Sequence, residues 1–144
     1  MKRLFVAITV FALLAACASK TLPPAADDSL YQALGQKPGI NRIVEGMLLI
    51  VVKDPRIGAH FRNVDPVMLR DKLVEKFCVE AGGPCTYTGV DMAEAHKGQH
   101  IDPSEFNALV EDLIKSMDSQ QVPVPVQNRL LARLAAQRGE VIRK

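Results

Sequence analysis

From about residue 29 onward, apolar residues recur every three or four positions, and no segment alternates cleanly between apolar and polar residues. This spacing predicts an all-α fold. The expected elements are a short helix from Ser29 to Gly35, a turn over 36–39, and helices over 40–53, 66–81, 92–97, 103–117 and 125–139. The helix over 40–53 is apolar on nearly all sides, so we expect it to be deeply packed.

Start and stop signals support three of these boundaries. Asp65 followed by Pro66 is typical of an N-cap and a first helical residue, and so is Asp102-Pro103, which has Glu105 in the capping-box position. Gly82-Gly83-Pro84 is expected to end the helix that begins at Pro66. The longest helices are expected to pack as two antiparallel pairs.

The N-terminus predicts an export signal with a lipid anchor. Basic Lys2 and Arg3 precede an apolar stretch over 4–12 that is too short to span a bilayer, and Leu14-Ala15-Ala16-Cys17 resembles a bacterial lipobox. We therefore expect 1–16 to be a signal peptide, Cys17 to be lipidated, 17–28 to be a tether and 29–144 to be one domain. Ala18 after the cysteine implies the bacterial outer membrane, facing the periplasm. The alternative is an ordinary signal peptide in which Cys17 is incidental.

Charge and composition exclude several classes of protein. Two of the 18 basic residues lie in the signal, which leaves 16 basic residues against 16 acidic ones, so nothing supports binding to nucleic acid. A hydrophobic content of 48% with 24% charged residues indicates a globular chain. No segment after the signal is apolar for long enough to span a bilayer, so the lipid is the expected contact with the membrane.

Cys78 and Cys85 remain as a pair once Cys17 is lipidated. In an oxidising compartment an even pair favours a disulfide. A metal or redox pair is the alternative, although six intervening residues match neither the spacing of zinc ligands nor that of a redox motif.

Three histidines, at positions 60, 96 and 100, are the other candidates for chemistry. Hydrolase and phosphate-loop motifs do not stand out, and the histidines lack the cysteine or carboxylate spacing of a zinc site. His96 lies on the short helical turn before Gly98 and one turn after Met92, where it is positioned to point inward. Taken alone, such a histidine is more often a core or surface residue than a ligand.

Four segments together resemble the group I truncated haemoglobins. They are Ser29-Leu30-Tyr31-Gln32-Ala33-Leu34-Gly35, Asp54-Pro55-Arg56-Ile57 with Phe61 beyond it, Gly82-Gly83-Pro84 with Tyr87-Thr88-Gly89, and Met92-Ala93-Glu94-Ala95-His96-Lys97-Gly98. The resemblance covers roughly 29–140 and is greatest to the subset that carries two cysteines around Gly-Gly-Pro. It implies a two-over-two helical sandwich around haem b, with His96 as the proximal iron ligand.

The same resemblance assigns the other haem-contacting positions. Phe61 matches the phenylalanine that stacks on the porphyrin, and Lys72 matches a basic position able to pair with a haem propionate. Tyr87 is expected near the haem edge. The apolar lining positions are Leu69, Phe77, Met92 and Phe106. The alternatives are a solvated helix charge for Lys72 and ordinary loop packing for Tyr87.

The distal side departs from the family pattern. A tyrosine and a glutamine serve oxygen-binding members at positions that are Leu48 and Leu73 here, and the adjacent distal residue is Leu69. A charge-assisted hydrogen bond to O₂ is worth about 1.5–3 kcal/mol, so its loss predicts weak O₂ affinity and a relative preference for CO and NO.

Other polar side chains near the distal side are not expected to replace that donor. Lys72 or Lys76 could enter the distal pocket and donate to the bound ligand. A solvated position is favoured for both, because drawing a charge into an apolar pocket is costly. We expect His60 to be exposed rather than a second iron ligand, and His100 to lie at the surface or on the propionate side.

Three functions compete on these grounds. The first is a tethered haem protein that reversibly binds a diatomic gas, with an unidentified redox partner. The second is a haem enzyme that detoxifies NO or reduces peroxide or nitrite; the apolar distal residues argue against NO dioxygenase and peroxidase activity, which need a polar group there. The third is a structural lipoprotein that has lost haem.

Overall fold

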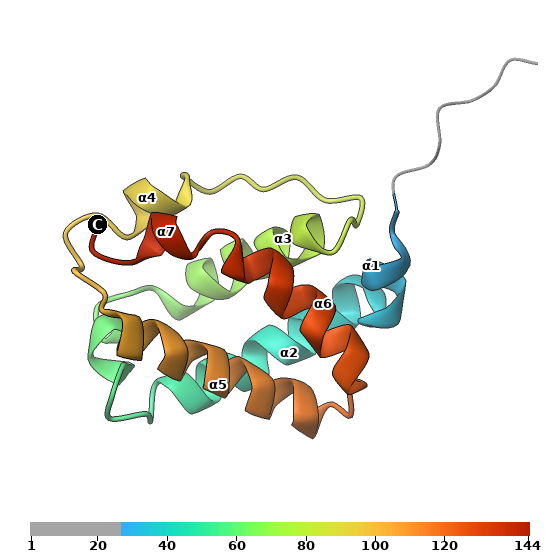
Figure 1. The fold of residues 1–144 in the computed structure, drawn as a ribbon, viewed down its shortest axis with the longest axis horizontal. Helices are drawn as coiled ribbons and strands as arrows, with labels where there is room; N and C mark the ends of the chain where they lie inside the picture. Colours follow the sequence, from blue (N-terminus) through green and yellow to red (C-terminus); the bar gives the residue numbers. More distant parts are fainter. Residues whose placement is uncertain (1–26) are drawn as a thin grey trace, which may run out of the picture.

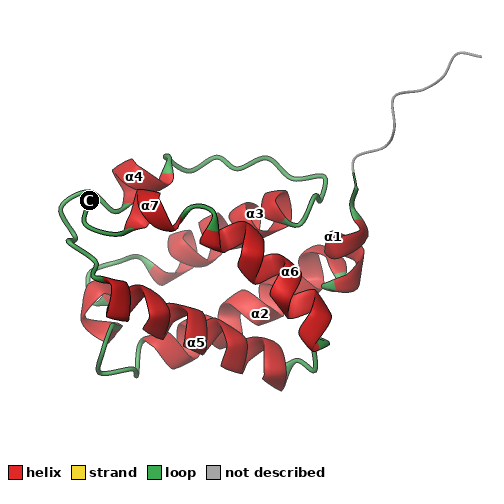
Figure 2. Cartoon of the chain, viewed as in Figure 1, coloured by secondary structure: helices red, strands yellow, loops and turns green. Residues whose placement is uncertain are grey.

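The structure is a computed structural model that describes residues 27–144. The expected signal peptide, Cys17 and nearly all of the expected tether lie outside the described residues. The helices are α1 (Ser29–Ala33), α2 (Gln36–Val51), the 3-10 turn η1 (Gly58–Phe61), α3 (Pro66–Glu80), α4 (Met92–Ala95), α5 (Pro103–Ser119), α6 (Val124–Ala135) and α7 (Arg138–Val141). The part of the chain described here contains no strand (Figure 2), which confirms the all-α prediction.

Two long helices begin at the caps that the sequence predicts. The Asp65 carboxylate accepts hydrogen bonds from the backbone N–H groups of Val67 and Met68 at the start of α3. At the start of α5, Asp102 and Glu105 form a complete capping box. Gly82, with a φ of +79°, lies just beyond the end of α3, in the left-handed conformation that glycine adopts without strain.

The turn expected over 36–39 is wrong, because α2 begins at Gln36. Gly35 and Gln36, with φ values of +78° and +58°, reverse the chain direction by themselves. Gly39 is then free to lie inside the first turn of α2, where its N–H donates to the carbonyl of Gly35 at 3.0 Å. A proline is tolerated in a first helical turn, so Pro38 does not delay the helix.

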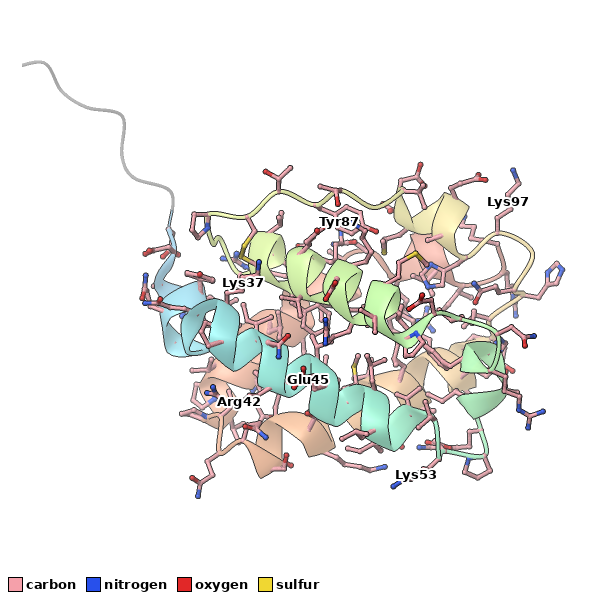
Figure 3. All side chains as sticks on the ribbon, turned by 180° about the vertical axis from the view of Figure 1, so that it is seen from behind. Lys37, Arg42, Glu45, Lys53, Tyr87 and Lys97 are labelled. Carbon is pink, nitrogen blue, oxygen red and sulfur yellow. A yellow bond between two sulfur atoms is a disulfide. The ribbon has the colours of Figure 1, made fainter. Side chains whose placement is uncertain are left out.

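Helix α2 packs against both α3 and α5 and forms the centre of the core (Figure 1). Its buried face consists of Gly39, Ile40, Ile43, Val44, Met47 and Val51. Deep packing on all sides is wrong, however: Leu49 and Val52 are 65% and 57% exposed. Charged side chains follow this outer side as well, among them Arg42, Glu45 and Lys53 (Figure 3).

The C-terminal segment closes over the turn that carries His96. The expected final helix is divided into α6 and α7, and α7 packs against α4 (Figure 1). The backbone N–H of Gly98 donates to the carbonyl of Lys144 at 3.0 Å, and that of Arg143 donates to the carbonyl of Ile101 at 2.9 Å. These bonds fix the turn after His96. Within residues 27–144, none of the helices combines the length and the apolar character that a membrane crossing requires.

Candidate haem site

The imidazole of His96 has one nitrogen engaged and the other available. His96 follows α4, whose first turn is capped by the Asp91 carboxylate. The Nδ1 atom lies 2.7 Å from the backbone carbonyl oxygen of Met92. Because a carbonyl oxygen only accepts, Nδ1 carries the hydrogen and Nε2 keeps its lone pair. This is the tautomer that binds a metal through Nε2.

The three leucines of the predicted distal side come from two helices. Leu48 lies on α2, and Leu69 and Leu73 lie on α3. All three are partly buried. Leu48, Leu73 and the Phe61 side chain from η1 pack against the hydrophobic core while keeping part of their surface accessible. Apolar surface of this kind suits a flat, largely apolar ligand such as a porphyrin ring.

The remaining predicted lining residues differ in burial. Phe77 is only 5% exposed and belongs to the core cluster. Met92 and Phe106 are partly buried. The guanidinium of Arg138 lies over the Phe106 ring, 5.6 Å from its centroid, so α7 covers one side of this phenylalanine.

Lys72 is held in a network between α3 and the loop over 82–91. Its ammonium contacts the Glu75 carboxylate at 3.2 Å and also the hydroxyl of Thr88. Bonds from the Thr88 backbone N–H and hydroxyl, together with Lys72, lower the pKa of Glu75. Sequence reasoning did not identify Thr88 as a partner of Lys72, because 16 positions separate the two residues.

Lys76 and Tyr87 form a second link between the same two segments. The Lys76 ammonium pairs with Glu80 at 3.1 Å and lies 5.3 Å from the centroid of the Tyr87 ring. Figure 3 shows Tyr87 beside α3. The Tyr87 hydroxyl donates to the carbonyl of Val90, and burial raises its pKa. Both lysines therefore have carboxylate partners on their own helix. The expected solvated position is wrong for Lys76, whose side chain is only 18% exposed, and Lys72 is also partly buried.

The expected exposure of His60 is wrong. Its side chain is 23% exposed, and its Nε2 atom lies 2.9 Å from Oε1 of Glu105 in the first turn of α5. Sequence reasoning identified Glu105 as a helix cap but not as this partner, because 45 residues separate the two. His100 is exposed, as expected for a surface residue.

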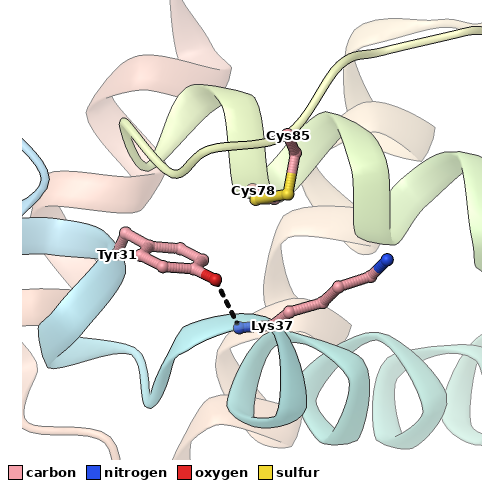
Figure 4. The surroundings of a disulfide bond; sticks show 4 residues. All are labelled: Tyr31, Lys37, Cys78 and Cys85. Carbon is pink, nitrogen blue, oxygen red and sulfur yellow. Dashed lines mark hydrogen bonds between the residues drawn. A yellow bond between two sulfur atoms is a disulfide. The ribbon is translucent and has the colours of Figure 1, made fainter.

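The predicted disulfide is confirmed. Cys78 near the end of α3 is bonded to Cys85 in the following loop, with the two Cα atoms 5.9 Å apart. Figure 4 shows this bond beside Tyr31, whose hydroxyl accepts a hydrogen bond from the backbone N–H of Lys37 at 3.2 Å. Cys78 is fully buried. The bond therefore ties α3 to the loop that leads to α4.

Two surface hollows lie away from the residues of the predicted haem site. One, of about 420 Å³, is formed by α1 with Gly82-Gly83-Pro84, and the other, of about 550 Å³, by the end of α2 with Asp112 and Lys115. Neither is lined by a residue of the predicted haem site.

The side chains around His96 bear on whether this site fits haem. Among residues 27–144, no three His, Cys, Asp or Glu side chains come together as a metal site. A bare ion at His96 would therefore lack the further protein ligands that such sites supply. Haem iron already has four porphyrin nitrogens and needs a single proximal imidazole, so the residues present fit haem.

Comparison with known proteins defines the class. The model of the bacterial-like globin family matches residues 29–142, and the chain belongs to this family. A group 1 truncated haemoglobin from Mycolicibacterium paratuberculosis is 26% identical over 113 residues, which cover 78% of this chain and 83% of the relative. Another from Synechocystis is 30% identical over 115 residues, or 77% of this chain and 90% of the relative.

Solved structures of truncated haemoglobins have the same fold as this chain. The crystal structure of the truncated haemoglobin from Tetrahymena pyriformis in its Fe(III) form has a TM-score of 0.78 at 26% identity, covering 80% of this chain and 98% of that one. The 2/2 haemoglobin from Synechococcus has a TM-score of 0.74 at 21% identity, which shows the fold alone. The two-over-two globin fold is thus confirmed, with haem b as the cofactor of the family.

Proposed function

We propose that this globin binds a diatomic gas reversibly at a five-coordinate haem iron that is held by His96 and has an apolar distal side. The tautomer of His96 carries the proposal, because the 2.7 Å bond from Nδ1 to the Met92 carbonyl leaves Nε2 free for iron. When bound, haem supplies an iron atom with one open position for a small ligand.

The chain's own residues would do three things. The bond to the Met92 carbonyl orients the imidazole and makes it a better ligand. Phe61, Met92 and Phe106 would supply apolar contact to the porphyrin. Leu48, Leu69 and Leu73 would exclude water from the distal side and offer no hydrogen bond to a gas. Weak retention of O₂ and relative preference for CO and NO follow from this lining.

Absorption spectra of the purified protein test the assignment. We expect a Soret band in the wild type that is lost or strongly changed in His96→Ala and unchanged in the control His100→Ala, since His100 is exposed. An unchanged spectrum in His96→Ala would show that another group holds the iron. A wild type that stays colourless after haemin addition would favour the haem-free alternative.

The enzymatic alternative has its own test. Stopped-flow mixing of the oxygenated protein with NO measures nitrate formation. The proposed apolar lining leads us to expect slow formation, because Leu48, Leu69 and Leu73 have no side-chain donor that could hold O₂. Fast formation would identify a dioxygenase instead.

We also propose that the protein is lipid-anchored through Cys17 at the outer membrane, facing the periplasm. The lipobox-like sequence supports this, and the Cys78–Cys85 disulfide supports an oxidising compartment. Cell fractionation compares the wild type with Cys17→Ser. We expect the wild type in the membrane fraction and the variant in the soluble periplasmic fraction; equal distribution would contradict the anchor.

A further inference from the structure

His60 and Glu105 join two distant parts of the predicted haem site. His60 lies in η1 and Glu105 in the first turn of α5, two segments that meet at one end of the molecule (Figure 1). Their side chains approach to 2.9 Å between Nε2 and Oε1. Each residue immediately precedes a predicted haem-lining phenylalanine, Phe61 in one segment and Phe106 in the other. The pair therefore links the two segments that carry these rings.

Glu105 is the fixed member of the pair. Its second oxygen accepts a hydrogen bond from the backbone N–H of Asp102 at 2.9 Å, which completes the capping box of α5. This backbone bond, followed by the bond to His60, lowers the pKa of Glu105. The carboxylate thus stays charged and in place, and the strength of the contact depends on the charge of the imidazole.

We propose that His60 and Glu105 are positioning residues of the haem site, which hold Phe61 and Phe106 in place and hold them more firmly when the imidazole is protonated. This inference rests on the proposed function, since the two rings can affect haem retention only if they contact bound haem.

The physical basis is the difference between a neutral and a charged donor. A neutral imidazole donates one ordinary hydrogen bond to the carboxylate, whereas an imidazolium forms a charge-assisted bond that is roughly twice as strong. Asp102 also faces the pair: its charge opposes the charged form of Glu105, and Arg143 in turn favours the charged form of Asp102. The pKa of Asp102 is lowered, so its carboxylate stays charged between pH 5.5 and 8.5. An imidazole is the kind of side chain that ordinarily changes charge in that range.

Haem loss from the ferric protein to excess apomyoglobin, followed by absorbance between pH 5.5 and 8.5, measures the effect. The variants are His60→Gln, which keeps an N–H donor but does not titrate, and Glu105→Gln, whose amide can still complete a capping box. His100→Gln is the control, because it removes an exposed imidazole. Comparing each variant with the wild type at the same pH removes the effect of pH on the His96–iron bond, which the wild type and all variants share.

We expect His60→Gln and Glu105→Gln to lose haem about fivefold faster than the wild type at pH 5.5, with the ratio falling towards one at pH 8.5. The double variant should add nothing, and His100→Gln should match the wild type throughout. A ratio that is the same at every pH, in a wild type that holds haem, overturns this proposal alone. A wild type that takes up no haemin overturns the proposed function, and this inference with it.

Discussion

At the scale of single residues, the proposed function assigns iron binding and oxygen retention to different side chains. The imidazole of His96 has its tautomer fixed by one backbone carbonyl, so its role as a ligand does not depend on the distal side. The distal positions Leu48, Leu69 and Leu73 carry no hydrogen-bond donor. In the proposed function, His96 would therefore hold the iron, whereas the distal leucines would set both the affinity for O₂ and the selectivity between gases.

The first prediction restores a distal donor. Leu48→Tyr places a hydroxyl on α2 from a partly buried position, and a hydrogen bond to O₂ should slow its release about tenfold to a hundredfold. Stopped-flow displacement of O₂ by CO measures the release rate. The control is Leu49→Tyr, because Leu49 is 65% exposed and should leave the rate unchanged. Equal rates in both variants would contradict the distal assignment of Leu48.

A second prediction concerns the corner after α2. The Arg56 side chain donates to both carboxylate oxygens of Asp54 and lowers the pKa of Asp54 to about 2. A lowered pKa means that this stabilisation is complete above the ordinary aspartate pKa, about 3.9, and is lost as the pH falls towards 2. As the pH is lowered from 5 to 2, the midpoint temperature of thermal unfolding should therefore fall more steeply in the wild type than in Asp54→Asn. Parallel curves would show that the pair contributes nothing.

At the scale of the elements, the sequence predicted those helix starts that are set by hydrogen bonds between neighbouring residues. The starts of α3 and α5 follow from Asp65, Asp102 and Glu105, whose capping hydrogen bonds join residues at most three positions apart. The start of α2 did not follow, because Pro38 and Gly39 are typical turn residues. Gly35 and Gln36 reverse the chain on their own, so Gly39 lies in the first turn of α2, where the carbonyl of Leu34 leaves no space for a side chain.

The third prediction tests this lack of space at Gly39. A Cβ atom on Gly39 would lie 1.9 Å from the backbone carbonyl oxygen of Leu34, and a backbone atom cannot yield as a flexible side chain can. Gly39→Ala should lower the free energy of unfolding by about 1–3 kcal/mol. Urea titration measures this. Gly139→Ala, where no atom lies within 4 Å, is the matched control and should gain up to about 1 kcal/mol from helix propensity.

At the scale of the whole molecule, the fold was predictable from periodicity and from the resemblance, but the contacts that connect the site were not. His60 pairs with Glu105, Lys72 with Thr88, and Arg133 with the carbonyl of Glu80. Each joins segments that only the folded chain brings together. A sequence shows which side chains can carry charge, whereas their partners depend on how the helices pack.

The Cys78–Cys85 disulfide is a link between segments that the sequence did predict, and the last prediction concerns it. It closes a small loop between α3, which carries two distal leucines, and the segment that leads to α4 and His96. By the chain-entropy model, reducing it should lower the free energy of unfolding by about 2.5 kcal/mol. Urea unfolding with and without dithiothreitol measures the loss, and Cys85→Ser should unfold like the reduced wild type and not respond to the reductant. If reduction leaves the midpoint of the wild type unchanged, the bond does not stabilise the fold, and α3 and the loop are held together by the Lys72–Thr88 and Lys76–Tyr87 contacts instead.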